Sequence, residues 1–111
     1  MRCIFINSYK TYNIFEIIFL CCNKYIVNRI QSLYPEHSIL SEEKTNINKN
    51  SEYIWIIDPL DGTKSFIEGD EDFCVCISLA LNTKPIIGCI AHPPSGTIWA
   101  GGNKIGSYKK N

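Results

Sequence analysis

An uninterrupted run of β-branched and aromatic residues in the middle of the chain ends in an acidic turn sequence. Residues 53–57 read Tyr-Ile-Trp-Ile-Ile, without polar alternation, and Asp58-Pro-Leu-Asp61-Gly follows at once. Such a run predicts a strand buried on both faces of a sheet in a layered α/β structure. Proline lacks the N–H that a sheet ladder needs, so we expect the strand to stop at Asp58-Pro59. Both carboxylates could then turn toward one point.

A helix and a short strand are predicted upstream of this run. From Asn23, a candidate N-cap, apolar residues recur at helical spacing until a proline blocks continuation, so we expect a helix over residues 23–34. Residues 38–41 predict a short strand that ends at Glu42, and residues 43–52 predict an exposed, mobile polar loop. If the short strand neighbours the buried run, the ends of the two strands lie together.

Three more strands are predicted downstream, at residues 73–81, 85–91 and 97–100, and their short links favour antiparallel hairpins. In the first, large residues alternate with small ones, so a helix could pack on the small side. The expected fold class is α+β, or layered α/β, with a helix-flanked and largely antiparallel sheet. Residues 1–22 lack a clean period and are interpreted as an atypical N-terminal extension, and residues 109–111 as a frayed tail.

Composition and charge exclude several classes of function. The 11 Lys and Arg residues balance 11 Asp and Glu residues, with no dense basic cluster, so the electrostatic footprint of a nucleic-acid binder is missing and a small-molecule partner is favoured. The apolar stretch at residues 14–22 is too short for a spanning helix, and the polar residues before it argue against a signal peptide. We therefore expect a cytoplasmic protein.

The cysteines do not predict a metal site. None of the 6 forms a Cys-x-x-Cys pair or stands at ligand spacing with His37 or His92, so zinc is not expected. Cys74 and Cys76 alternate within an apolar run, and we interpret them as small core residues of a reduced protein.

The acidic residues at the strand ends predict a magnesium site. Asp58 and Asp61 lie close together in sequence, and Glu42, at the end of the other strand, is the expected third acid. Carboxylates with a backbone carbonyl suit Mg²⁺, which prefers octahedral oxygen coordination and leaves positions for water and phosphate.

The residues after the second aspartate predict a phosphate cradle. Gly62 lets the backbone approach an anion closely, and Thr63 adds a hydroxyl beside two free amides. A short helical turn beginning at Thr63 would add unpaired N–H groups. The competing interpretation is a solvated turn, because Asp, Pro and Gly are common turn residues for local reasons.

The segment Asp58-Pro-Leu-Asp-Gly-Thr63, followed by Phe66, resembles the signature of the inositol monophosphatase superfamily. Leu60, Lys64 and the upstream Ile-Leu-Ser-Glu-Glu at residues 39–43 are most similar to its 3′(2′),5′-bisphosphate nucleotidase branch, the CysQ type. The resemblance runs from about residue 23 to residue 108. It implies the N-terminal part of an inositol monophosphatase-like (sugar phosphatase) fold, with residues 23–111 as a partial catalytic domain.

The resemblance also implies roles for particular residues. Glu42 and Asp58, with the Leu60 carbonyl, would hold one magnesium ion, and Asp58 with Asp61 a second. Glu42 and Thr63 would orient the attacking water, and no covalent phosphoenzyme is implied.

The resemblance places the phosphate and substrate contacts on the same segment. The amides of Gly62 and Thr63 would hold phosphate oxygens, with Glu42 and Asp61 also facing the substrate. Lys64 could meet a second phosphate or be an ordinary solvated lysine.

The chain departs from the family pattern in two places. The Thr-x-Ala-Asp expected near residues 18–22 is replaced by Phe19-Leu-Cys-Cys, and the later Trp-Asp metal motif would lie beyond Asn111. The second ion would therefore lack a ligand, and the substrate pocket would be incomplete.

Three hypotheses follow for the function. The first is a magnesium-dependent phosphatase that converts adenosine 3′,5′-bisphosphate to AMP and phosphate, weakly active or inactive by itself. The near alternative is an inositol-1-monophosphatase. The alternative from another class is a non-catalytic remnant or interaction module, with self-association or a separate C-terminal half as possible partners.

Overall fold

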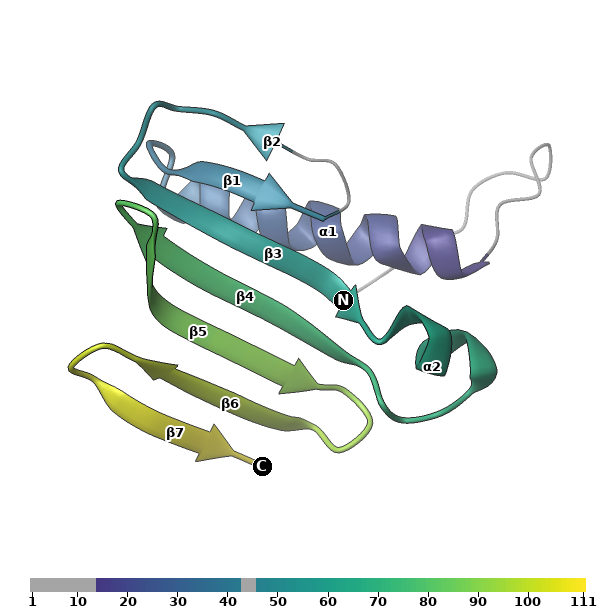
Figure 1. Ribbon diagram of the computed structural model, residues 1–111. Helices are drawn as coiled ribbons and strands as arrows, with labels where there is room; N and C mark the ends of the chain where they lie inside the picture. Colours follow the sequence, from purple (N-terminus) through teal and green to yellow (C-terminus); the bar gives the residue numbers. More distant parts are fainter. Residues whose placement is uncertain (1–13, 43–45) are drawn as a thin grey trace, which may run out of the picture.

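The computed structural model describes residues 14–42 and 46–111, which form one sheet with two helices (Figure 1). The elements in chain order are α1 (Ile14–Leu33), β1 (Ser38–Ser41), β2 (Asn46–Ile47), β3 (Tyr53–Asp61), α2 (Thr63–Glu68), β4 (Cys74–Leu81), β5 (Lys84–His92), β6 (Thr97–Gly102) and β7 (Gly106–Lys110). The predictions for residues 1–13 and 43–45, within the N-terminal extension and the polar loop, concern parts of the chain outside the described residues.

The sheet has seven strands in the order β2-β1-β3-β4-β5-β6-β7. The pair of β1 and β3 is parallel, and every other pair is antiparallel. The expected fold class, a helix-flanked and largely antiparallel sheet, is confirmed. Because β1 and β3 run in the same direction, they end at the same edge of the sheet.

The helix α1 begins earlier than predicted. It starts at Ile14 and not at Asn23, so the domain boundary expected at residue 22 falls inside it. No proline or glycine interrupts the sequence there, and helical structure can propagate through it. Asn23 is therefore not an N-cap: it is buried inside α1, where its Oδ1 accepts a hydrogen bond from the Ser41 hydroxyl of β1.

The core lies between α1 and one face of the sheet. Val27 and Ile30 of α1 pack with Ile39 of β1 and Ile57 of β3, and Ile57 is only 1% exposed. Ile56, the preceding residue, is 40% exposed, so the expectation of a strand buried on both faces is wrong for this chain. The reason is that α1 covers only one side of the sheet (Figure 1).

The side of β4 that lies on the same face as α1 is also opposite to the one predicted. Ile77 is paired with Ile57, so the large residues of β4 share the face that α1 covers. Cys76 and Ser78, on the small side, belong to the other face. The prediction compared side-chain sizes within one strand, whereas the choice of face depends on the neighbouring strand that α1 contacts. We call the side covered by α1 the helix face and the other side the open face.

Two short strands were not predicted. β2, inside the expected polar loop, pairs with β1, and β7 pairs with β6, so Lys109 and Lys110 are not a frayed tail. Every residue of β7 is exposed, which explains why apolar patterning did not reveal it. Among the described residues, neither helix is long and apolar enough to cross a membrane.

Candidate active site

A bulge in β3 brings two aspartates to the same face of the sheet. Asp58 is opposite Cys76 of β4, and Asp61 is opposite Cys74, so two residues of β3 stand against one of β4 between these pairs. In a regular strand, residues three apart point to opposite faces. The extra residue restores the alternation, and a bulge of this kind re-aims side chains. Both carboxylates therefore belong to the open face.

The strand continues through the proline that was expected to end it. β3 runs to Asp61, and Pro59 lies within the bulge. The pairing with β1 on the other side has already ended at Ile57. No neighbouring strand thus requires an N–H from residue 59, which is the condition under which a sheet tolerates proline.

Glu42 reaches the same point from β1. Ser41 is paired in parallel with Ile57, and the Glu42 N–H donates a hydrogen bond to the Ile57 carbonyl at 3.0 Å. This bond continues the ladder by one step and sets Glu42 beside the next residue of β3. The Glu42 side chain lies against that of Asp58, so the two carboxyl groups can share a hydrogen bond when one of them is protonated. Glu42 and Asp58 thus lie side by side at one sheet edge, and Asp61 shares their face. The ligand oxygens of these three acids do not all lie within 4.8 Å of one another in the described part of the chain.

The crowding of these acids changes the protonation of Asp58. Burial, followed by the hydrogen bond and the charge of Glu42 and by the charge of Asp61, raises the pKa of Asp58 from 3.8 to about 6. The Leu60 N–H, which donates to Asp58 Oδ1 at 3.3 Å, acts in the opposite direction. Converging carboxylates that disfavour their own ionisation form an oxygen-rich donor set suited to a hard cation such as Mg²⁺.

The turn after β3 depends on Gly62. Its φ of +87° lies in the left-handed region, and a Cβ there would overlap the carbonyl oxygen of Asp72. The short helical turn predicted at Thr63 is present as α2. Phe66 of α2 meets Phe73 edge-on, with ring centroids 4.9 Å apart, which fixes α2 against the segment that enters β4.

The other predicted site residues lie around this turn. The Leu60 carbonyl accepts a long hydrogen bond from the Thr63 hydroxyl at 3.5 Å, while the Leu60 side chain is buried. Lys64 is exposed on α2, one residue after Thr63. The Leu60 carbonyl and the Thr63 hydroxyl therefore stand together next to the carboxyl cluster.

Sequence reasoning missed two cysteines at the site. Cys74 and Cys76 are only partly buried and are not core residues. The Cys74 Sγ lies 3.8 Å from Asp61 Oδ2 and 3.6 Å from the Cys76 Sγ. Burial, Cys74 and the two aspartates raise the pKa of the Cys76 thiol to about 12. The spacing of Cys74 and Cys76, two residues apart in a strand, already predicted that they share one face. Only the register with β3 shows that Asp58 and Asp61 lie on that same face.

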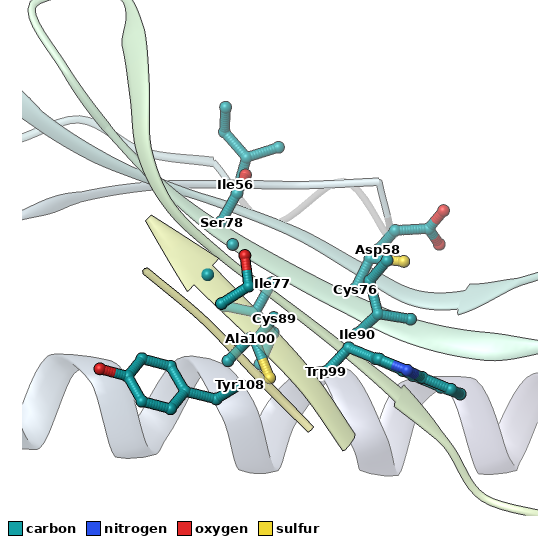
Figure 2. Close-up of a pocket in the computed structure, with 13 residues that line it drawn as sticks. Ile56, Asp58, Cys76, Ile77, Ser78, Cys89, Ile90, Trp99, Ala100 and Tyr108 are labelled. Carbon is teal, nitrogen blue, oxygen red and sulfur yellow. The ribbon is translucent and has the colours of Figure 1, made fainter. Parts of the chain in front are cut away.

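A shallow apolar depression of about 570 Å³ adjoins the carboxyl cluster (Figure 2). Asp58 and Cys76 stand at one end of it, and Ile90 and Trp99, on the same face, also line it (Figure 2). Gly88 and Gly101 of β5 and β6 contribute no side chains to the lining. An organic group attached to a phosphate at the acidic end could rest on such a surface.

The chain is similar to known phosphatases along most of its length. Residues 7–111 match the inositol monophosphatase family. A 3′(2′),5′-bisphosphate nucleotidase CysQ of Haemophilus influenzae is 34% identical over 82% of this chain and 35% of its own length. A fructose-1,6-bisphosphatase/inositol-1-monophosphatase of Aquifex aeolicus is 37% identical over 71% of this chain and 30% of its own.

A solved structure has a similar fold. The inositol monophosphatase from Anabaena (Nostoc) superposes with a TM-score of 0.74 at 35% identity, covering 78% of this chain and 35% of that one. The chain thus spans about a third of the length of the relatives it matches. Its acidic cluster, its sheet and its sequence all agree: the chain belongs to the inositol monophosphatase family of magnesium-dependent phosphomonoesterases, and it corresponds to the N-terminal portion of that fold.

Proposed function

We propose that this chain provides the metal-holding part of a phosphatase that hydrolyses the 3′-phosphate of adenosine 3′,5′-bisphosphate. The observation that supports this proposal most directly is the β3 bulge, which puts Asp58 and Asp61 on one face while Glu42 contacts Asp58. Three carboxylates from two strand ends provide oxygen donors of the kind that Mg²⁺ selects.

The proposed roles divide among the residues at the turn. Glu42, Asp58 and Asp61, with the Leu60 carbonyl, would hold Mg²⁺. When bound, the metal supplies neutralising charge for the phosphate and its leaving oxygen, and lowers the pKa of the attacking water. Thr63 orients that water together with Glu42, its hydroxyl already lying beside the Leu60 carbonyl.

The preference for a nucleotide bisphosphate rests on Leu60, Lys64 and the Ser-Glu-Glu sequence at residues 41–43. Lys64 is exposed on α2 beside the proposed phosphate position, where its ammonium group could meet a second phosphate. Inositol 1-phosphate is the second candidate substrate, because the similarity to the Aquifex and Anabaena proteins is as strong as that to the nucleotidase.

We also propose that the chain needs a partner to become an active enzyme. The open face exposes large apolar side chains on four strands, namely Leu40, Ile56, Ile90 and Trp99. Uncovered surface of this kind promotes association. The natural cover is a C-terminal half of the family fold, and by itself the chain should show little turnover. A cytoplasmic location is part of this proposal.

Calorimetric titration tests the metal site. Mg²⁺ or Mn²⁺ is titrated into the wild type, Asp58→Asn and the control Asp70→Asn, which replaces an exposed acid beyond α2. We expect weak binding that Asp58→Asn abolishes and Asp70→Asn leaves unchanged. Equal binding by wild type and Asp58→Asn would remove the motif from the metal site.

Phosphate release tests the substrate and the need for a partner. The purified chain is assayed with Mg²⁺ and either adenosine 3′,5′-bisphosphate or inositol 1-phosphate, with and without a separately expressed C-terminal half of an intact family member. We expect turnover only with the added half, and a preference for the nucleotide. A preference for the inositol ester would reassign the substrate, and turnover without a divalent ion would refute the mechanism. Binding without turnover in any combination would favour a non-catalytic module.

A further inference from the structure

Three ligand-type side chains gather on the open face, and one of them, Asp61, also belongs to the carboxyl cluster. Ligand atoms of Asp61, Cys74 and Cys76 all lie within 4.8 Å of one another. The same bulge creates this set, because it aligns Asp61 with Cys74 across the β3–β4 ladder. Alternation along β4 then adds Cys76 on the same face.

The spacing of these atoms matches the coordination sphere of a tetrahedral ion. Zinc binds thiolate sulfur at about 2.3 Å and carboxylate oxygen at about 2.0–2.2 Å, which implies ligand–ligand separations of about 3.4–3.8 Å. The two sulfurs are 3.6 Å apart, and the Cys74 sulfur is 3.8 Å from the Asp61 oxygen. The Cys76 sulfur and the Asp61 oxygen lie within 4.8 Å, so two of the three separations already match and the third has to close by about 1 Å at most.

A disulfide is a weaker explanation of the paired sulfurs. Cys74 and Cys76 are two residues apart in one extended strand, so their Cα atoms stand about 6.6 Å apart. That separation is near the upper limit of disulfide geometry, at about 6.8 Å. Both side chains are only partly buried and Asp61 is exposed, so an ion can reach all three from solvent.

We infer that Asp61, Cys74 and Cys76 form a site for a thiophilic divalent cation of the zinc class, and that its occupation withdraws Asp61 from the magnesium site. Thiolate ligands select such ions over Mg²⁺. On binding, each thiol gives its proton to solvent and becomes a thiolate ligand, and water can occupy the fourth position. The antagonism with Mg²⁺ rests on the proposed function, whereas the thiophilic site does not.

Cobalt(II) serves as a spectroscopic probe for the thiophilic site in the full 111-residue chain under reducing conditions. We expect Co²⁺ to produce a thiolate-to-cobalt charge-transfer absorption that Zn²⁺ abolishes by displacement. Cys76→Ser should weaken Co²⁺ binding more than about tenfold. The control is Cys89→Ser, because Cys89 pairs with Ile77 and so belongs to the helix face. Circular dichroism verifies that each variant is folded.

The inference fails if no charge-transfer band forms, or if the double variant Cys74→Ser/Cys76→Ser binds Co²⁺ as the wild type does.

The antagonism is tested by titrating Mg²⁺ with and without Zn²⁺: Zn²⁺ should suppress Mg²⁺ binding in the wild type but not in Cys76→Ser. Unchanged Mg²⁺ binding in Zn²⁺-loaded wild type would refute the sharing of Asp61. Absence of Mg²⁺ binding without Zn²⁺, alongside an intact cobalt band, would instead refute the proposed function alone.

Discussion

The two faces of the sheet differ in how deeply their apolar side chains are buried. On the helix face, Ile39 and Ile57 are 2% and 1% exposed beneath α1. On the open face, Ile56 and Trp99 are each 40% exposed. The helix face therefore has its own apolar core. The open face holds the acidic site and apolar side chains that no other described part of the chain covers.

This contrast separates stability from function. Burial of apolar side chains contributes most of the folding free energy, and it is concentrated under α1. The site on the open face is shaped by backbone geometry, namely a bulge in β3 and a left-handed glycine after it. Substitutions on the two faces should consequently act on different properties.

The largest effect is expected from removing the most deeply buried side chain. Ile57→Ala leaves a cavity under α1 and should lower the free energy of unfolding by about 2–5 kcal/mol. Ile56→Ala, one residue away on the open face, deletes the same atoms from a half-exposed position and should cost clearly less. Urea unfolding followed by circular dichroism measures both, and equal losses would contradict the contrast between the faces.

A smaller loss is expected where the backbone shapes the site. Gly62→Ala adds the strain of a left-handed residue, about 1–2 kcal/mol, to an overlap with the Asp72 carbonyl. The matched control is Gly69→Ala at the other end of α2, where φ is +82° but nothing lies within 4 Å. Urea unfolding should show a larger loss for Gly62→Ala, accompanied by weaker Mg²⁺ binding. If both variants behaved alike, the close approach at Gly62 would have no energetic role.

The two tryptophans allow a finer comparison. The Trp55 indole N–H donates to His37 Nδ1 at 2.9 Å, and the His37 ring stacks on Tyr34 and Tyr53. Trp55→Phe removes this donor and should cost about 1 kcal/mol or more of unfolding free energy. Trp99→Phe on the open face should cost less in the isolated chain. The reverse order in thermal unfolding would show that the open face contributes more than its exposure suggests.

The smallest expected effect is a dependence of stability on pH. The pKa of Asp58 is about 6 in the folded chain against an ordinary 3.8, so folding favours its protonated form. The resulting stabilisation is complete below the ordinary value and is lost as pH rises through about 6. The metal-free chain should thus melt at a lower temperature at pH 7.5 than at pH 5.

Two controls accompany that measurement. Asp58→Asn should flatten this part of the pH profile, and Mg²⁺ at pH 7.5 should restore stability to the wild type by offsetting the carboxylate repulsion. A wild type and an Asp58→Asn variant with the same pH dependence would show that Asp58 does not govern it.

Much of the fold could be predicted from local sequence. The apolar run before Asp58 and the hairpin links indicated the central strands, because these signals depend on neighbouring residues only. The N-terminal start of α1 was missed because its apolar stretch lacks a clean amphipathic period. β7 was missed because it is exposed throughout and is held by main-chain pairing with β6.

The sequence by itself determined which chemical groups the chain carries: the Asp-Pro-Leu-Asp-Gly-Thr motif, the acid after the first short strand and the strands that bear them. Only the tertiary structure decided how these groups meet. The face on which Asp61 lies depends on a bulge in the pairing of β3 with β4. The contact of Glu42 with Asp58 depends on the parallel pairing of β1 with β3. The approach of Cys74 to Asp61 likewise depends on that register. Because side-chain direction in a sheet alternates with every residue, a one-residue shift in pairing moves a group to the opposite face, and no local pattern encodes that shift.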